Sequence, residues 1–409
     1  MRILFIAMVN SIHTARWINQ ISEQGWEIHL FTSTDDSSIH RQLMNTIIHG
    51  ITLRPPDIER RTRLPGALKW PFPFGHHYAN QMLIMIKNSE RIQPYLPSQY
   101  RRLSRVIEKI KPDIIHSLEI QHAGYLTLEA KKHIGGDFPK WIITNWGSDI
   151  YLFGRLIEHI DRIREVLAEC DYYGCECHRD VELARAFGFQ GKVLPVLPNA
   201  GGYDLEWVKQ FRQPGRTSAR RLILLKGYQH WAGRALFGLR ALELCADVIK
   251  GYRIVVYRAK EDVKVAAELL AHKTKIPIDI IPRCSHEEML RLHGQARISI
   301  GLSISDAVST SFLEAIVMGS FPIQSCTGCA DEWIRDEETG LLVPPEDPEQ
   351  IALAIRHALT DDKLIDFATS INDRLVAEKL EYKKIKSQVI EMYKQVYSST
   401  YSEKENKAL

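Results

Sequence analysis

Short apolar runs alternate with amphipathic stretches of helical length through the first half of the chain. Residues 3–7 are apolar, Ala15, Ile18 and Ile21 recur at helical spacing, and residues 27–31 form a second apolar run. Strand-length and helix-length segments in alternation predict βαβ units, and therefore a parallel sheet with helices on both faces. The same reading predicts further strands at residues 51–53, 113–117, 141–145, 172–175 and 193–197.

The alternation restarts after a polar, basic stretch. Residues 210–221 contain Pro214, Gly215 and four arginines, which predicts a linker between two domains. The sequence therefore predicts an α/β protein of two Rossmann-like domains, each built on a parallel sheet, that face each other across a cleft where a ligand binds at the carboxyl ends of the strands. The predicted boundaries are residues 1–209 for the first domain, 210–221 for the linker, 222–380 for the second domain, about 381–397 for a helix that returns to the first domain, and 398–409 for a flexible tail.

Composition narrows the class of protein. With 409 residues, 45% of them hydrophobic and 25% charged, the chain is globular rather than disordered or fibrous. A net charge of +3 is too balanced for a general nucleic-acid binder, so we expect no nucleic-acid partner. The apolar start is too short for a signal peptide and no run of 18 apolar residues occurs, so we expect a cytoplasmic protein. The seven cysteines lack zinc spacing and are read as reduced thiols.

Candidate chemistry gathers after the predicted strand at 297–302. A loop containing Asp306 leads through three hydroxyl residues into a short predicted helix that carries Glu314. The free N–H groups and dipole of a helix N-terminus bind anions, so a diphosphate would fit there. Glu314 could then accept hydrogen bonds from ribose hydroxyls, and Asp306 from a second sugar. The residues alone leave an equal alternative, in which Ser311 and Glu314 form only a capping box.

This segment is similar to the donor-binding signature of retaining glycosyltransferases of family 4 with the GT-B fold. Seven residues separate Asp306 from Glu314, and a turn at 318–323 and the segment 339–343 follow as in that family. The likeness extends over nearly the whole chain, because residues 112–116, 145–149 and 197–201 resemble family segments of the first domain in the same order.

The resemblance implies roles for residues of the second domain. Lys226 and Arg234 stand where the family carries cations that neutralise the donor diphosphate, although a solvated surface cation is the alternative for each. Asp306 occupies the place of the usual Glu, whose side chain is one methylene longer. The implied catalytic residues are His116, Asp306, Lys226 and Arg234, and the implied donor-binding residues are Ser309, Thr310, Ser311 and Glu314.

Residues at the predicted strand ends of the first domain are candidates for the acceptor. His116 ends one predicted strand, and a structural histidine is its alternative. Trp146 stands where the family has a histidine. The expected acceptor-binding residues are Asn10, Ser11, His13, Glu119, His122 and Asp149.

The resemblance implies a retaining glycosyltransferase of the hexosyltransferase type. It would move a sugar from a nucleotide sugar to a saccharide or lipid-linked saccharide in cell-envelope glycan synthesis, without a cofactor. We expect no metal, since the chain lacks the Asp-x-Asp motif of metal-dependent sugar transferases. The departures from the family at Asp306, at Trp146 and in residues 226–234 keep two alternatives open, a non-catalytic subunit with the same fold and a sugar-nucleotide epimerase.

One segment is strongly basic. Residues 51–112 contain twelve Lys and Arg against four Asp and Glu, and aromatic residues lie among them. Cations beside aromatic side chains suit an anionic membrane surface, so we expect peripheral association with the inner face of a membrane. A merely solvated basic face is the alternative. The aromatic residues are Trp70, Phe72, Phe74, Tyr78 and Tyr95.

Overall fold

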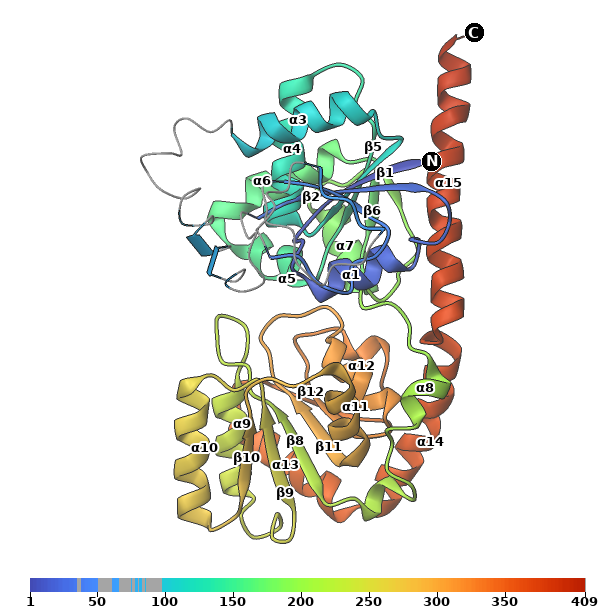
Figure 1. Ribbon diagram of the computed structural model, residues 1–409. Coiled ribbons are helices and arrows are strands. Elements are labelled where there is room, and N and C mark those ends of the chain that lie inside the picture. The colour runs from blue at the N-terminus through green and yellow to red at the C-terminus, as the bar shows by residue number, and fades with distance from the viewer. Residues whose placement is uncertain are drawn as a thin grey trace. The chain divides into compact units, whose positions relative to one another are not determined.

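The computed structural model describes residues 1–34, 38–50, 61–65, 75, 78–79, 81–82, 85 and 98–408, the last nine of them by backbone alone. The chain divides into two compact units. The first contains Met1–Gly201 and Ile385–Leu409, and the second contains Gly202–Lys384. Each unit is a parallel sheet with helices packed against it (Figure 1). The predicted fold, two Rossmann-like parallel-sheet domains, is confirmed.

The first unit is built on seven parallel strands in the order β3-β2-β1-β4-β5-β6-β7. Successive residues of β1 enter different cores: Ile3 and Phe5 pack on one face of the sheet, Leu4 and Ile6 on the other. A strand buried on both faces reads as the continuous apolar run seen in the sequence. The strands are β1 (Arg2–Ala7), β2 (Glu27–Thr32), β3 (Ile47–His49), β4 (Ile114–Leu118), β5 (Lys140–Thr144), β6 (Tyr172–Gly174) and β7 (Lys192–Val193).

Helices cover both faces of this sheet (Figure 1). Helices α1 (Ile12–Asn19) and α15 (Tyr382–Ala408) contribute apolar side chains to one core, and α3 (Gln99–Ile110), α4 (Tyr125–Ile134) and α6 (Ile157–Glu169) to the other. Further helices in the described part of this unit are the π-helix η2 (Ile120–Gly124), α5 (Ser148–Tyr151), η3 (Phe153–Arg155) and α7 (His178–Ala186).

The second unit contains six parallel strands in the order β10-β9-β8-β11-β12-β13. They are β8 (Leu222–Lys226), β9 (Arg253–Tyr257), β10 (Ile278–Ile281), β11 (Ala296–Gly301), β12 (Phe321–Ser325) and β13 (Leu341–Val343). The larger core joins the sheet to α9, α10, α13 and α14, and a smaller core joins it to α11. The helices are α8 (Leu205–Lys209), η4 (Thr217–Ala219), α9 (Ala235–Leu244), α10 (Glu261–Thr274), α11 (His286–Gln295), α12 (Thr310–Val317), η5 (Ala330–Glu332), α13 (Pro348–Thr360) and α14 (Asp362–Lys379).

The predicted linker at 210–221 lies inside the second unit, which begins at Gly202. Arg220 is fully buried, and its Nη1 donates to the backbone oxygens of Ala296 (3.1 Å) and Met318 (3.2 Å). The hydroxyl of Thr217 donates to the oxygen of Gly319 at 2.9 Å. Arg220 therefore satisfies carbonyl groups at the start of a strand and the end of a helix, and together with Thr217 and Ser218 it is buried in the second unit, although residues 213–216 are exposed.

Two further differences concern element bounds. Helix α15 continues to Ala408, through the residues predicted as a flexible tail. The strand predicted at 51–53 lies outside the described residues, and β3 precedes it at Ile47–His49. Within the described part of the chain, no helix is both long and apolar enough to cross a membrane.

Candidate functional site

The strand order reverses once in each sheet, between β1 and β4 and between β8 and β11. At such a point, the loops that follow the two strands leave toward opposite faces of the sheet, and open α/β sheets bind ligands in the crevice between them. Most of the polar residues selected from the sequence lie in these strands or directly after them, so both reversals are candidate sites.

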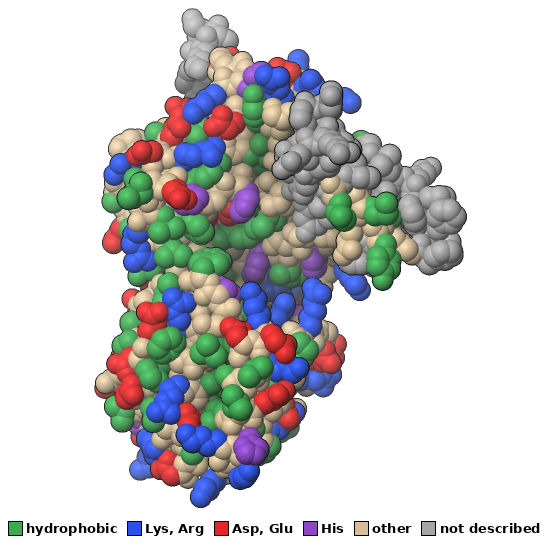
Figure 2. Space-filling view, turned by 90° about the vertical axis from the view of Figure 1, so that its left-hand side faces the viewer, with side chains coloured by type: hydrophobic (Ala, Val, Ile, Leu, Met, Phe, Trp, Pro, Cys, Tyr) green, Lys and Arg blue, Asp and Glu red, His purple; other side chains and the backbone are tan. Residues whose placement is uncertain are grey.

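In the second unit an ammonium group and hydroxyl groups meet at this reversal. Lys226 ends β8, and its Nζ donates to Oγ of Ser309 at 3.0 Å. Ser309 is the N-cap of α12, its Oγ lies 2.9 Å from that of Ser311, and Thr310 is the first helical residue. Lys and Arg side chains gather at this end of the unit (Figure 2). The positive charge, the hydroxyl groups and the helix N-terminus are groups that attract anions, so together they make a candidate anion site.

Glu314 lies in the second turn of α12 and is largely buried. Its Oε1 is 2.9 Å from Nε2 of His286, the first residue of α11. Because the helix begins at Thr310, a capping box would pair Ser309 with Phe312 rather than Ser311 with Glu314. The capping-box interpretation is therefore wrong, and a carboxylate stands one turn from the anion site.

The two predicted cations differ in what they contact. Arg234 donates from Nε to Glu346 (2.6 Å) and from Nη1 to the backbone oxygens of His230 (3.2 Å) and Gly233 (3.0 Å). Arg234 thus holds the loop between β8 and α9, whereas Lys226 points to the N-terminus of α12. Asp306 lies on the loop between β11 and α12 and is half-buried.

In the first unit, three of the predicted acceptor residues lie where β1 leads into α1: Asn10 and Ser11 precede the helix, and His13 is its second residue. Asn10 is exposed, and Oγ of Ser11 caps α1 by accepting from the backbone N–H of His13 at 3.2 Å. The ring of His13 lies 5.7 Å from that of Trp146, centroid to centroid. Trp146, read from the sequence as a departure from the family, therefore comes next to a predicted acceptor residue.

The loops after β4 and β5 are held by buried carboxylates. Glu119 accepts from the backbone N–H of His122 at 2.9 Å, and its Oε2 lies 3.2 Å from Nδ1 of that histidine, which raises the histidine pKa. Asp149 accepts from the backbone N–H groups of Ile120 (3.1 Å) and Trp146 (2.8 Å), and burial raises its pKa well above the usual range. Of these three side chains His122 is the exposed one, at 58%.

His116 is completely buried in β4. Its Nδ1 lies 2.6 Å from the hydroxyl of Tyr393 and its Nε2 lies 2.7 Å from that of Thr144, so both ring nitrogens are hydrogen-bonded. Burial lowers its pKa to about 3, which keeps the ring neutral. This geometry favours the structural role over contact with a sugar.

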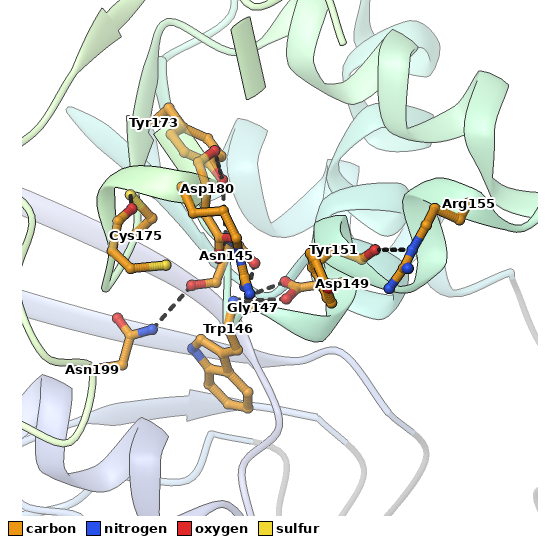
Figure 3. A network of polar contacts seen from close by, with 12 residues as sticks. Asn145, Trp146, Gly147, Asp149, Tyr151, Arg155, Tyr173, Cys175, Asp180 and Asn199 are labelled. Carbon is orange, nitrogen blue, oxygen red and sulfur yellow. Dashed lines mark hydrogen bonds and ion pairs between the residues drawn. The ribbon is translucent and has the colours of Figure 1, made fainter. Parts of the chain in front are cut away.

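A polar network joins the loop at Asn145 to the loop at Asn199, which are separate in the sequence (Figure 3). Nδ2 of Asn145 donates to Asp180 at 2.7 Å and to the hydroxyl of Tyr173 at 3.0 Å. Nδ2 of Asn199 donates to the backbone oxygen of Asn145 at 3.0 Å. The segments 145–149 and 197–201, which resemble the family, identify these two loops in the sequence. Neither segment indicates that the two loops are hydrogen-bonded to each other.

Both halves of the chain match family models. Residues 2–66 and 76–170 match the family described as "Glycosyl transferase 4-like", and residues 239–371 match "Glycosyl transferases group 1". The chain is a glycosyltransferase of the GT-B type. Among curated protein sequences, none matches it significantly.

Solved structures show the same fold over the length of this glycosyltransferase. A sucrose-phosphate synthase from Thermosynechococcus elongatus is 15% identical with a TM-score of 0.69, over 98% of this chain and 100% of that one. HepE of Anabaena in complex with UDP is 11% identical with a TM-score of 0.65, over 97% and 100% of the two chains. A trehalose-6-phosphate structure from E. coli, bound with UDP-2-fluoro glucose, is 10% identical with a TM-score of 0.63, over 97% and 99% of the two chains.

Proposed function

We propose that this glycosyltransferase transfers a hexose, with retention of anomeric configuration, from a nucleotide sugar to a saccharide acceptor. The observation that carries the proposal is the group of Lys226, Ser309 and Ser311 at the N-terminus of α12, with the Glu314 carboxylate one turn further. Such a group fits a nucleoside diphosphate, with the phosphates at the helix N-terminus and the ribose beside the carboxylate.

Each of these groups has a defined task in the proposed reaction. Lys226 offsets the negative charge that develops on the departing nucleoside diphosphate. Glu314 accepts hydrogen bonds from the ribose hydroxyls, and Asp306 from the transferred sugar. We further propose that neither a metal ion nor a cofactor takes part, because Lys226 and the α12 N-terminus offer the positive charge that a bound cation would otherwise supply. The proposed retention of anomeric configuration rests on the resemblance to family 4.

The first experiment is a screen of nucleotide sugars by thermal denaturation. A ligand at 100 times its dissociation constant stabilises the folded state by about 2.7 kcal/mol, a readily measured shift. UDP-glucose is the first donor to test, because solved structures of this fold are bound with UDP and UDP-glucose. NMR of the product of the donor that binds then gives the anomeric configuration. Stabilisation by no nucleotide sugar would overturn the proposal, an inverted product would overturn retention, and loss of activity in EDTA would overturn metal independence.

We propose that the acceptor is a saccharide or lipid-linked saccharide of the cell envelope, presented at the cytoplasmic face of a membrane. Helix α3 supports a membrane contact, because Arg101, Arg105 and Lys109 recur every four residues and are exposed, while Leu103 and Ile107 are buried. A stripe of cations on one helix face is attracted to anionic lipid headgroups. Tyr78 is 73% exposed. The other aromatic residues of the predicted basic segment, Trp70, Phe72, Phe74 and Tyr95, lie outside the described residues.

For acceptor recognition, we propose His13 and His122 as contacts in the first unit. His13 is the second residue of α1 and His122 lies in η2, the elements that follow β1 and β4 at the reversal of strand order, and the His122 side chain is 58% exposed. In this proposal Glu119 and Asp149 fix the conformation of the loops rather than contact the acceptor, since both accept hydrogen bonds from backbone N–H groups. Replacing His122 with Asn should raise the acceptor KM and leave nucleotide-sugar affinity unchanged. An unchanged acceptor KM would exclude this contact.

Vesicle sedimentation tests the membrane contact. Binding to vesicles containing anionic lipid should fall as salt rises, because the attraction is screened over about 8 Å at physiological ionic strength. Replacing Arg101, Arg105 and Lys109 with Ser should weaken binding by far more than replacing Lys132, Arg164 and Lys192, which removes the same charge from exposed positions elsewhere in the first unit. Equal losses, or no sedimentation at low salt, would contradict the proposal and favour a soluble acceptor.

A further inference from the structure

The loop between β8 and α9, residues 227–234, carries an exposed tryptophan. The side chain of Trp231 is 57% exposed, although an indole ring is usually mostly buried. It belongs to a row of aromatic rings, since Tyr228 and His230 lie 5.4 Å apart and His230 and Trp231 also 5.4 Å apart, centroid to centroid. Neither the family resemblance nor the anion site assigns a role to this ring.

The backbone around Trp231 is held on both sides. Nδ1 of His230 accepts from the backbone N–H of Ala232 at 3.1 Å, and the oxygen of Ala232 accepts from the N–H of Ile304 at 2.9 Å. Gly233 bridges Ser303 in an antiparallel pair. A side chain at Gly233 would collide with the backbone of Tyr228, so the tight turn requires glycine there. An exposed indole on a fixed loop is preorganised to contact a ligand.

The loop also lies beside the anion site. It starts directly after Lys226, whose Nζ is 4.7 Å from the ring centroid of Tyr228. Burial and the charges of Lys260, Lys226 and Arg234 lower the pKa of His230, whereas the charge of Asp306 opposes this, so all four charged groups are near the loop. Its bonds to Ser303 and Ile304 place it against the loop that carries Asp306. The loop of Trp231 thus lies against the loop of Asp306, the residue that we propose contacts the transferred sugar.

We propose that Trp231 determines donor specificity by stacking on the face of the transferred sugar ring, an inference that rests on the proposed function. A pyranose presents several C–H groups on one face, and the face of an aromatic ring carries the negative part of its quadrupole, so the two attract each other. The axial and equatorial pattern of the hydroxyls decides which hexoses offer an apolar face. Trp231 therefore selects among nucleotide sugars that share one nucleotide.

Comparing two ligands of the same protein tests this role. Replacing Trp231 with Ala should weaken binding of the nucleotide sugar about five- to ten-fold while the affinity for the corresponding nucleoside diphosphate, which lacks the sugar, stays unchanged. Replacing it with Phe should recover part of the loss. Trp207, which is 40% exposed on α8, provides a matched control variant. Titration calorimetry measures both affinities.

The outcomes separate this inference from the proposed function. If the wild-type protein binds no nucleotide sugar, the proposed function fails. If the wild-type protein binds one and Trp231→Ala binds it equally well, only the stacking role fails. Equal loss for the nucleotide sugar and the nucleoside diphosphate would also overturn the stacking role, because it would place the indole against the nucleotide.

Discussion

The two reversals of strand order present polar residues that are engaged in different ways. In the first unit, His116 hydrogen-bonds to side chains inside the core, and Glu119 and Asp149 accept backbone N–H groups of the loops. In the second unit, the ammonium of Lys226 and the hydroxyls of Ser309 and Ser311 gather at a helix N-terminus and are only half-buried. At the same position in the topology, buried carboxylates thus hold loops in one unit, whereas in the other the polar groups stay accessible for the nucleotide-sugar contact that we propose.

This difference shows that a polar residue at a strand end is not by itself a ligand contact. What separates the two cases is whether the donors and acceptors of the side chain are satisfied within its own unit and away from solvent. Changes at His116, Glu119 and Asp149 should therefore lower stability, and changes at Lys226, Ser309 and Ser311 should lower activity or ligand affinity.

The largest expected effect is on turnover. Lys226→Ala should lower kcat about 100- to 1,000-fold with little change in stability, because a cation positioned at developing negative charge contributes strongly to catalysis. Steady-state kinetics measures the loss. Lys250→Ala, which removes an exposed cation of the same unit, should keep full activity. Normal turnover of the Lys226→Ala enzyme would contradict the difference in role that we infer between the polar residues of the two units.

The next effect is on the pH dependence of stability. Burial lowers the pKa of His116 from 6.5 to about 3, so the folded state binds fewer protons than the unfolded state between these values. Stability is therefore fully present above pH 6.5 and falls as the pH decreases, by about 2 kcal/mol between pH 6.5 and 5. Chemical denaturation at several pH values measures this. His116→Gln should remove that part of the slope, and identical slopes for both proteins would contradict the assignment.

The third effect is on donor affinity. Glu314→Gln should weaken nucleotide-sugar binding about ten-fold, because a neutral amide replaces the charged acceptor for ribose hydroxyls. Calorimetric titration provides the affinity, and denaturation should show an unchanged fold. Glu349→Gln, at the start of α13 in the same unit, is the control. Loss of stability without loss of affinity would mean that Glu314 only anchors His286.

The smallest expected effect concerns the hydroxyl of Tyr393, which accepts from Nε1 of Trp17 at 2.9 Å and lies 2.6 Å from Nδ1 of His116. Tyr393→Phe should destabilise the protein by about 1 to 2 kcal/mol, because buried polar atoms lose partners. Nucleotide-sugar affinity should not change. A variant of wild-type stability would show that this network contributes little to the first unit.

Much of the fold could be predicted from the sequence because buried parallel strands are continuous apolar runs. The segment from Asp306 to Glu314 could also be located, since a loop, its hydroxyl residues and a short helix are neighbours in the chain. Arg220 and His116 show where such reasoning stops. The partners of Arg220 are carbonyl groups about a hundred residues away, and those of His116 belong to β5 and α15. Local patterns contain no information about such distant contacts.

Helix α15 has a consequence for synthesis on the ribosome. Val389, Met392 and Tyr393 belong to the same core as Ile3 and Phe5, although the entire second unit separates them in the chain. At about 5 to 20 residues per second, a nascent first unit waits roughly ten to forty seconds after residue 201 before these side chains exist. Throughout that interval one face of its sheet stays partly uncovered, which makes the half-made chain a natural substrate for chaperones.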